Sequence, residues 1–274
     1  MRKKIIYNNK QLSYSTQGSG PVVVLLHGFG EDGSIWHNQI ETLKNFQLII
    51  PELPGTGQSE IIEDMSMDGL ADAVQFILKA EQSNDSPPNG NKVTMIGHSM
   101  GGYITLAFAD KYSEILNGMG LFHSTAYADT EEKVQARRKG IEFIRSHGAN
   151  EFLKTTIPNL YAPFIKENNP SLIQKHLDSV HNFSADSLVN YYESMIKRPA
   201  RVEVLKNITV PVLFIFGKYD SAVPLKDGLE QCYLPSLSYI HVLDQSGHMG
   251  MIEEHEKTNI ILSNYLLSID HQTP

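Results

Sequence analysis

The stretch KVTMIGHSMGGY, residues 92–103, decides the fold of this chain. Residues 93–96 read as a short apolar strand, which runs into a tight turn and then a helix that begins with small residues. The turn, Gly-His-Ser-Met-Gly at 97–101, has the pattern G-x-S-x-G. Serine at such a strand-to-helix turn is held in a strained conformation with its hydroxyl above the sheet, and the glycines let strand and helix approach closely. Ser99 is therefore a candidate nucleophile, although serine at a helix start also serves as an N-cap.

Further strands and helices alternate on both sides of this stretch. Strands are expected over 22–26, 46–50, 118–122, 212–216 and 239–243, of which 22–26 and 212–216 are expected to be buried, and a hairpin over 5–7 and 12–16. Helices are expected over 35–43 (with Ser34 as N-cap), 67–81, 224–232 and 253–267, and a polar connector over 83–91. This alternation predicts an α/β fold with a doubly wound, mostly parallel sheet and an antiparallel N-terminal hairpin.

The pattern changes between residues 124 and 201, where no buried strand is expected. Helical segments separated by prolines are expected over 130–146, 151–156, 171–180 and 186–197. Because a structureless loop of this length is improbable in a compact domain, we predict a helical cap over 124–201, inserted into a core domain formed by 1–123 and 202–274. The aromatic residues of the insert are expected to form mainly the cap's own core. Arg137, Arg138 and Lys139 are expected to lie on a solvated helix face.

Composition excludes several classes of partner. The formal net charge of −8 argues against binding to nucleic acids or anionic membranes. A single cysteine, Cys232, rules out an intrachain disulfide and fits a reducing compartment. We find no apolar run long enough for a signal peptide or a membrane span. We expect a cytoplasmic protein that acts on a small-molecule substrate, while the sequence leaves its oligomeric state open.

Polar loops follow the later strands and offer partners for Ser99. A serine needs a base to take its proton, and the base needs an acid to orient it. His248 and Asp220 each follow a predicted strand, so both are expected above the sheet edge that carries Ser99. The chain order Ser, Asp, His is the order expected for this architecture. Two other acids, Asp227 and Asp244, are rivals that sit less well relative to the strand ends.

An oxyanion hole needs two N–H donors. The amide of Met100, directly after the candidate nucleophile, is one, and the amide of Phe29 in the HGFG loop after residues 22–26 is the other. His27 is expected to shape that loop, and His98 to pack beneath the Ser99 turn.

The remaining histidines carry weaker expectations. His123 and Ser124 follow a strand end, and pocket lining is one alternative for them. His248 and His255 have no third ligand beside them and no H-E-x-x-H pattern occurs, so we expect no metal site.

HGFG, PGTGQS, GHSMGG, FGKYD and SGHM, in this order and spacing, resemble the α/β-hydrolase superfamily, and within it the small esterase-like members with a helical cap. The resemblance covers about residues 21–267. It implies a serine hydrolase without a cofactor, in which Ser99 is the nucleophile, His248 the base and Asp220 its orienting acid. Glu52 departs from the aspartate that relatives often carry there, at a position that is not catalytic in the family. Relatives that resemble epoxide hydrolases and haloalkane dehalogenases carry aspartate at the turn, so Ser99 argues against those activities.

The sequence thus predicts a carboxylesterase that acts on small to medium, apolar esters. The same residues would also serve a hydrolase of carbon–carbon bonds in dienol-type diketones, or a thioesterase. From another class, a hydrolase scaffold used as a non-catalytic small-molecule receptor remains an alternative.

Overall fold

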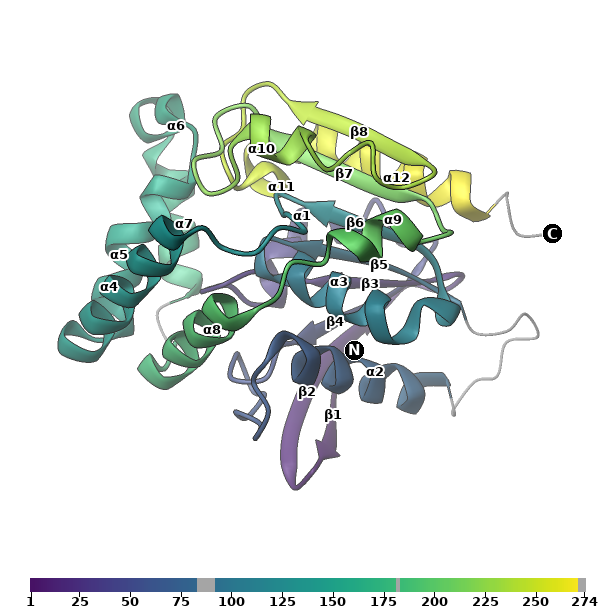
Figure 1. Ribbon diagram of the computed structural model, residues 1–274, viewed down its shortest axis with the longest axis horizontal. Coiled ribbons are helices and arrows are strands. Elements are labelled where there is room, and N and C mark those ends of the chain that lie inside the picture. The colour runs from purple at the N-terminus through teal and green to yellow at the C-terminus, as the bar shows by residue number, and fades with distance from the viewer. Residues whose placement is uncertain (83–91, 181–182, 271–274) are drawn as a thin grey trace.

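A computed structural model describes residues 1–82, 92–180 and 183–270 of the chain (Figure 1). The expected polar connector over 83–91 lies outside the described residues. Within these ranges, no helix combines the length and the apolar character needed to cross a membrane.

In the described part of the chain, eight strands form one sheet in the order β1-β2-β4-β3-β5-β6-β7-β8. They are β1 (Arg2–Tyr7), β2 (Lys10–Gln17), β3 (Val22–Leu26), β4 (Gln47–Glu52), β5 (Val93–His98), β6 (Leu116–Phe122), β7 (Val212–Gly217) and β8 (Ser238–Leu243). β2 pairs antiparallel with both β1 and β4, and the pairs from β4 to β8 are parallel. The hairpin turns at Asn8 and Asn9, whose φ angles of 47° and 62° are ones that asparagine tolerates. The predicted mostly parallel sheet with an antiparallel N-terminal hairpin is confirmed.

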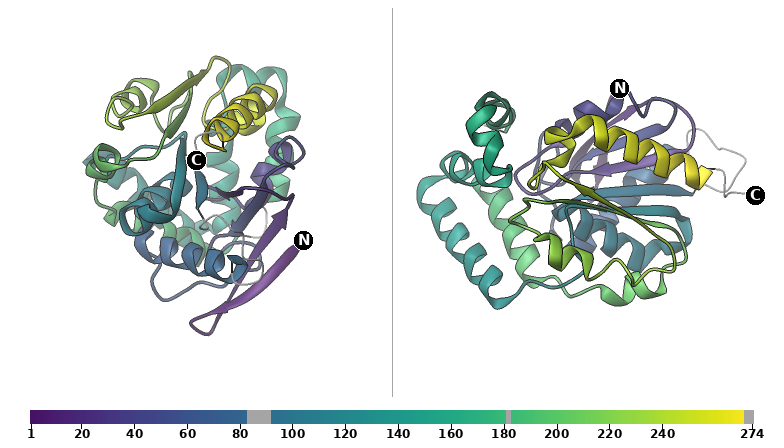
Figure 2. Two further views of the ribbon diagram at one scale, coloured as in Figure 1. Left: turned by 90° about the vertical axis from the view of Figure 1, so that its right-hand side faces the viewer. Right: turned by 90° about the horizontal axis from the view of Figure 1, so that it is seen from above.

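Helices cover both faces of this sheet. Val24 and Leu26 of β3 belong to a core cluster with α2 (Met67–Gln82) and α3 (Met100–Tyr112). Val23 and Leu25 point the other way, into a cluster with α12 (His255–Asp270). Figure 2 shows α12 on one side of the strands and the two earlier helices on the other. A strand covered on both faces is apolar throughout, as the β3 sequence is.

Most of the helices between β6 and β7 gather at one end of the molecule, over the sheet edge where the parallel strands end (Figure 1). They are α4 (Glu131–His147), α5 (Ala149–Thr156), the 3-10 turn η3 (Ile157–Leu160), α6 (Pro163–Asn168), α7 (Pro170–Ser179) and α8 (Ala185–Lys197). The last helix before β7, α9 (Val202–Asn207), lies apart from them beside α3. Among the aromatic residues of this segment, Phe152, Tyr161 and Tyr191 are buried in the two core clusters. The division of the chain into core and cap stays a prediction.

The expectation for Arg137 is wrong. Its Nε donates to Asp129 Oδ2 at 2.6 Å, and Arg198 lies 2.9 Å from the other oxygen of the same carboxylate. The Arg198 guanidinium also lies over the ring of Tyr103, 3.8 Å from its centre. This group, in which Arg198 is buried and Arg137 half-buried, joins α4 and the end of α8 to α3, the helix that begins after Ser99. Arg138 and Lys139 are exposed, as expected.

Three predicted helices differ from expectation in where they begin or end. Over 35–43 the chain forms the 3-10 turn η1 (Gly33–Trp36) and a short α1 (His37–Ile40). Asp32 rather than Ser34 is the cap, because its carboxylate accepts from Ser34 N at 2.9 Å. The closing helix is divided into α11 (Gly250–Glu253) and α12, and at the break the Glu254 carboxylate binds the loop at Gln245 and Ser246. The helix predicted over 224–232 is shortened to α10 (Leu225–Leu229).

Candidate active site

Ser99 stands in a strained turn between β5 and α3. Its φ of 51° and ψ of −115° are rare for a residue with a side chain. A Cβ at Gly97 would lie 2.2 Å from the Gly101 carbonyl group, and one at Gly101 would lie 2.7 Å from the His27 carbonyl oxygen. The two glycines are therefore required for strand and helix to approach so closely, which is why the pattern needs them at this spacing.

The Ser99 hydroxyl does not cap the helix. No side-chain bond from Ser99 to the first turn of α3 is formed, and Ser99 Oγ has no hydrogen-bond partner among the residues that the structure describes. The backbone is fixed instead, since Ser99 N donates to Phe122 O at 2.9 Å and Ser124 Oγ donates to Ser99 O at 2.8 Å. The N-cap interpretation of this serine is wrong, and its oxygen remains available for chemistry.

His248 and Asp220 meet at the same edge of the sheet, after β8 and β7. His248 Nδ1 donates to Asp220 Oδ2 at 2.8 Å, and both side chains are buried. The other carboxylate oxygen accepts from the amides of Ala222 and Val223 at 2.8 and 2.9 Å. Burial alone would raise the pKa of Asp220, but the charge of His248 and the hydrogen bonds of the histidines beside it hold that pKa well below its usual value. Burial opposes protonation of His248, yet the Asp220 carboxylate raises the His248 pKa overall.

The rival acids lie elsewhere. Asp227 is exposed on α10, and Asp244 pairs with Lys257 on the surface. No hydrogen bond joins Ser99 Oγ to His248 Nε2 within the described ranges. Such contacts are often long before a substrate is bound.

The loop that carries His248 is anchored on the predicted cap. His248 N donates to Leu160 O at 2.6 Å. The Glu253 carboxylate accepts from Ala162 N at 2.7 Å and from the amides on either side of His248, Gly247 N at 2.9 Å and Met249 N at 3.1 Å. The position of His248 therefore depends on the segment around η3 as well as on the sheet.

The two expected oxyanion donors are free of other acceptors. Neither Phe29 N nor Met100 N donates to another group in the described part of the chain. The Phe29 ring stacks on Tyr192 of α8 with the ring centres 4.2 Å apart, which ties its loop to the predicted cap. His27 Nε2 accepts from Leu53 N at 3.1 Å, so this histidine shapes the loop, as expected.

A buried ion pair that the sequence did not indicate lies beneath the turn. Both ring nitrogens of His98 face oxygen acceptors, Nδ1 facing Glu31 Oε2 at 2.8 Å and Nε2 facing His248 O at 2.9 Å. Since neither oxygen carries a hydrogen, both nitrogens donate, and His98 has the geometry of an imidazolium paired with a carboxylate. Glu31 also accepts from Gly28 N at 2.7 Å. Burial opposes ionisation of Glu31, but His98 lowers its pKa to about 2.

We expect Glu31→Gln to destabilise the fold at neutral pH by about 3 kcal/mol, because it leaves the buried His98 without its counter-charge. The folded pKa of Glu31, about 2, lies below its ordinary value of 4.5, so the stabilisation is present above pH 4.5 and is lost as the pH falls toward 2. Urea unfolding of parent and variant at pH 7 and pH 4 measures this: the difference in free energy of unfolding should be smaller at pH 4. As a control, Glu151→Gln alters an exposed Glu151–Lys154 pair and should change little. Equal stabilities of the parent and Glu31→Gln at pH 7 would contradict the ion pair.

His123 is a second residue whose contacts the sequence analysis did not predict. It and Ser124 are fully buried and have no exposed surface with which to line a pocket. His123 Nδ1 lies 3.1 Å from Asp220 Oδ2, and the ligand atoms of His123, Asp220 and His248 all lie within 4.8 Å of one another. Such a group has the composition of a metal site, but hydrogen bonds between the two imidazoles and the carboxylate account for its short distances. The sequence did carry one signal for this contact: His123 directly follows a central strand, at the sheet edge that carries the other candidate residues.

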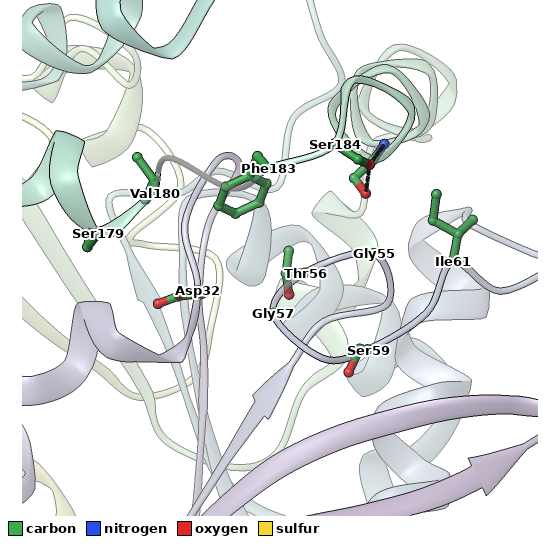
Figure 3. A pocket seen from close by; sticks show the side chains of 11 residues that line it. Asp32, Gly55, Thr56, Gly57, Ser59, Ile61, Ser179, Val180, Phe183 and Ser184 are labelled. Carbon is green, nitrogen blue, oxygen red and sulfur yellow. Dashed lines mark hydrogen bonds between the residues drawn. The ribbon is translucent and has the colours of Figure 1, made fainter. Parts of the chain in front are cut away.

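A separate pocket of about 420 Å³ opens between the loop after β4 and the segment that joins α7 to α8 (Figure 3). Thr56 and Ser59 line one side, and Val180, Phe183 and Ser184 line the other. None of the described residues that line it is a predicted site residue. We therefore place the candidate site by the geometry around Ser99 and not by this pocket.

Comparisons with known proteins agree with this architecture. Residues 21–255 match the model of the alpha/beta hydrolase fold family. The 3-oxoadipate enol-lactonase 1 of Acinetobacter baylyi is 27% identical over 95% of this chain and 94% of its own. A 2-hydroxy-6-oxononadienedioate/2-hydroxy-6-oxononatrienedioate hydrolase of Dechloromonas aromatica is 26% identical over 93% and 90%.

Among solved structures, a thermophilic esterase from Thermogutta terrifontis superposes with a TM-score of 0.89 at 26% identity, covering 98% of this chain and 99% of that one. The superfamily expected from the motifs is thereby confirmed. This chain belongs to the alpha/beta hydrolase fold family and is a hydrolase.

Proposed function

We propose that this hydrolase is a carboxylesterase that cleaves small to medium esters through an acyl-enzyme on Ser99. The observation that carries the proposal is the 2.8 Å contact between His248 Nδ1 and Asp220 Oδ2. It leaves Nε2 of the same ring as the atom that can take a proton, at the sheet edge where Ser99 stands in its strained turn. The strain and the free hydroxyl of Ser99 support the nucleophile role, because a serine with a purely structural role would be expected to use its hydroxyl.

In the proposed reaction His248 Nε2 takes the Ser99 hydroxyl proton while Oγ attacks the ester carbonyl carbon. The oxyanion accepts hydrogen bonds from the amides of Phe29 and Met100. The tetrahedral intermediate collapses, the bond to the alcohol oxygen breaks, and the alcohol leaves with the proton from His248. Water then attacks the acyl-enzyme, gives a proton to His248, and the acid is released as that proton returns to Ser99. Asp220 stays ionised and holds the tautomer and orientation of the base.

The surroundings of Phe29 support an apolar substrate. Phe29 and Tyr192 are partly exposed and stacked, and Phe152 of α5 meets both rings edge-on at 6.2 and 5.7 Å between centres. Aromatic rings beside a proposed oxyanion donor favour apolar acyl or alcohol groups. The enol-lactonase and esterase relatives support ester chemistry, since a lactone is a cyclic ester.

A second candidate is hydrolysis of a carbon–carbon bond in a dienol-type diketone. It is favoured by the Dechloromonas relative, whose name describes a hydrolase of hydroxy-oxo-dienedioates. The same serine, base and oxyanion donors would serve this reaction, so the substrate-binding residues decide between the two.

The test is hydrolysis of p-nitrophenyl esters from acetyl to decanoyl, together with a vinylogous diketone and an acyl-CoA. We expect the short and medium esters to react fastest, a fluorophosphonate probe to label Ser99, and a chelator to leave the rate unchanged. Fastest turnover of the diketone or the acyl-CoA would replace the ester assignment. A folded protein that neither reacts with the probe nor turns over any substrate would be a small-molecule receptor.

A further inference from the structure

His123 lies between the loops that carry the acid and the base of the proposed reaction. It follows β6 directly and is fully buried, and its φ of 50° is unusual for a residue other than glycine. Its Nδ1 lies 3.1 Å from Asp220 Oδ2. Its Nε2 lies 3.2 Å from Gly250 N, the first residue of α11 after the His248 loop.

Three contacts of the His123 ring bear on which nitrogen carries the hydrogen: a backbone amide faces each nitrogen, and the Asp220 carboxylate faces Nδ1. Nε2 faces an N–H donor, so it must accept, and in a neutral ring the hydrogen then stands on Nδ1. Nδ1–H thus donates to the carboxylate of Asp220. The Gly217 amide also lies 3.1 Å from Nδ1. Each tautomer sets one backbone N–H against a ring N–H, at Gly217 in the first and at Gly250 in the opposite one. Only the opposite tautomer also places a ring lone pair against the Asp220 carboxylate, so the charge of Asp220 favours the hydrogen on Nδ1.

Asp220 is therefore held on all sides. Oδ2 accepts from two imidazoles, those of His123 and His248, and Oδ1 accepts from two backbone amides. A carboxylate has about four lone-pair positions, and here each has a donor. A carboxylate held in this way cannot rotate away from the base without breaking hydrogen bonds in a buried environment.

We propose that His123 is a positioning residue for the hydrolase, which holds Asp220 Oδ2 in the orientation that His248 requires. The inference rests on the proposed function of Asp220 and His248. His123 does not touch the substrate; it acts through Asp220, and through Gly250 it also fixes the loop that follows the base.

Removing the His123 donor should change the titration of the base. Asp220 raises the pKa of His248. The same oxygen, Oδ2, is also in contact with Nδ1 of His123. Without the His123 donor, the charge of Asp220 acts more fully on His248, so the His248 pKa should rise further. The acid limb of the pH profile, where kcat/KM falls as His248 becomes protonated, should therefore move to higher pH. The other groups that face the base are His98, Glu31 and Glu253, and the variants below leave them unchanged.

The experiment compares three substitutions in the full chain. His123→Leu removes both contacts. His123→Asn keeps an amide near the position of Nδ1 and tolerates a positive φ, whereas His123→Gln carries its amide one carbon further, toward Gly250. We expect Leu and Gln to lower kcat by on the order of 10- to 100-fold with little change in KM, and to move the acid limb upward by roughly half a unit to one unit. His123→Asn should restore kcat to within a few-fold of the parent, and the acid limb with it.

His176→Leu is the matched control. It removes another buried histidine, which bonds to Tyr161 away from Asp220, and should leave the acid limb in place. If folded His123→Leu kept the parent kcat and acid limb, or if Gln rather than Asn restored them, the proposal would be overturned. Should the Leu variant not fold, the comparison of Asn with Gln decides. NMR titration of His248 in the folded parent and variants measures the same shift without turnover, so a failure of the proposed ester hydrolysis is distinguished from a failure of this inference.

Discussion

Ser99→Ala is expected to lower kcat for the best p-nitrophenyl ester by on the order of 10³- to 10⁶-fold, with a much smaller change in KM. The hydroxyl is the atom that would form the acyl-enzyme, and no other described hydroxyl stands in such a turn above the sheet edge. The residual rate would come from the proposed oxyanion donors, the amides of Phe29 and Met100, which the substitution leaves in place. The variant should also fail to react with a fluorophosphonate probe.

Although Ser99→Ala should lose activity, its free energy of unfolding should stay close to that of the parent. Alanine removes a hydroxyl that makes no hydrogen bond among the described residues, and the strained backbone is held by contacts of Ser99 N and O, which alanine retains. Ser113→Ala, an exposed serine at the other end of α3, is the control and should match the parent. Parent-like ester turnover by purified Ser99→Ala would remove Ser99 from the mechanism.

Asp220→Asn is expected to lower kcat by roughly 10⁴-fold at neutral pH. An amide in place of the carboxylate can present an N–H to His248 Nδ1. The ring hydrogen would then move to Nε2, the atom that must accept the Ser99 proton. The substitution also removes the charge that stabilises protonated His248 during the reaction. Rates are compared over a pH series, with circular dichroism to check the fold.

The rival acids provide controls for this second prediction. Asp227→Asn and Asp244→Asn remove exposed carboxylates and should leave kcat close to the parent value. A larger loss in either of them than in Asp220→Asn would reassign the acid. The three variants together test the choice that the sequence left open.

Much of the fold could be predicted because its elements depend on contiguous residues. The apolar runs of β3 and β7 match the structure to within one residue, and α2 and the four helices predicted in the insert match within about two. The short helix α6 (Pro163–Asn168) was not predicted. The segment at 35–43 could not be predicted in the same way. Its side chains show a helical pattern, but the chain enters it through a cap at Asp32 and forms only a 3-10 turn and one short α-helical turn.

The sequence by itself determined the Ser99 turn and the order of the proposed catalytic groups. The turn is local, because Gly97 and Gly101 are needed within five residues of chain, and strand ends place Asp220 and His248 at a common edge. Which side chains contact each other was decided only by the tertiary structure. Arg137 is half-buried against Asp129 while Arg138 beside it is solvated, and Glu31 and His123 each meet residues far along the chain. Hydrogen bonds and charges act through space over a few ångströms. Residue type and spacing along the chain therefore indicate which residues are candidates, but not which of them lie in contact in the fold.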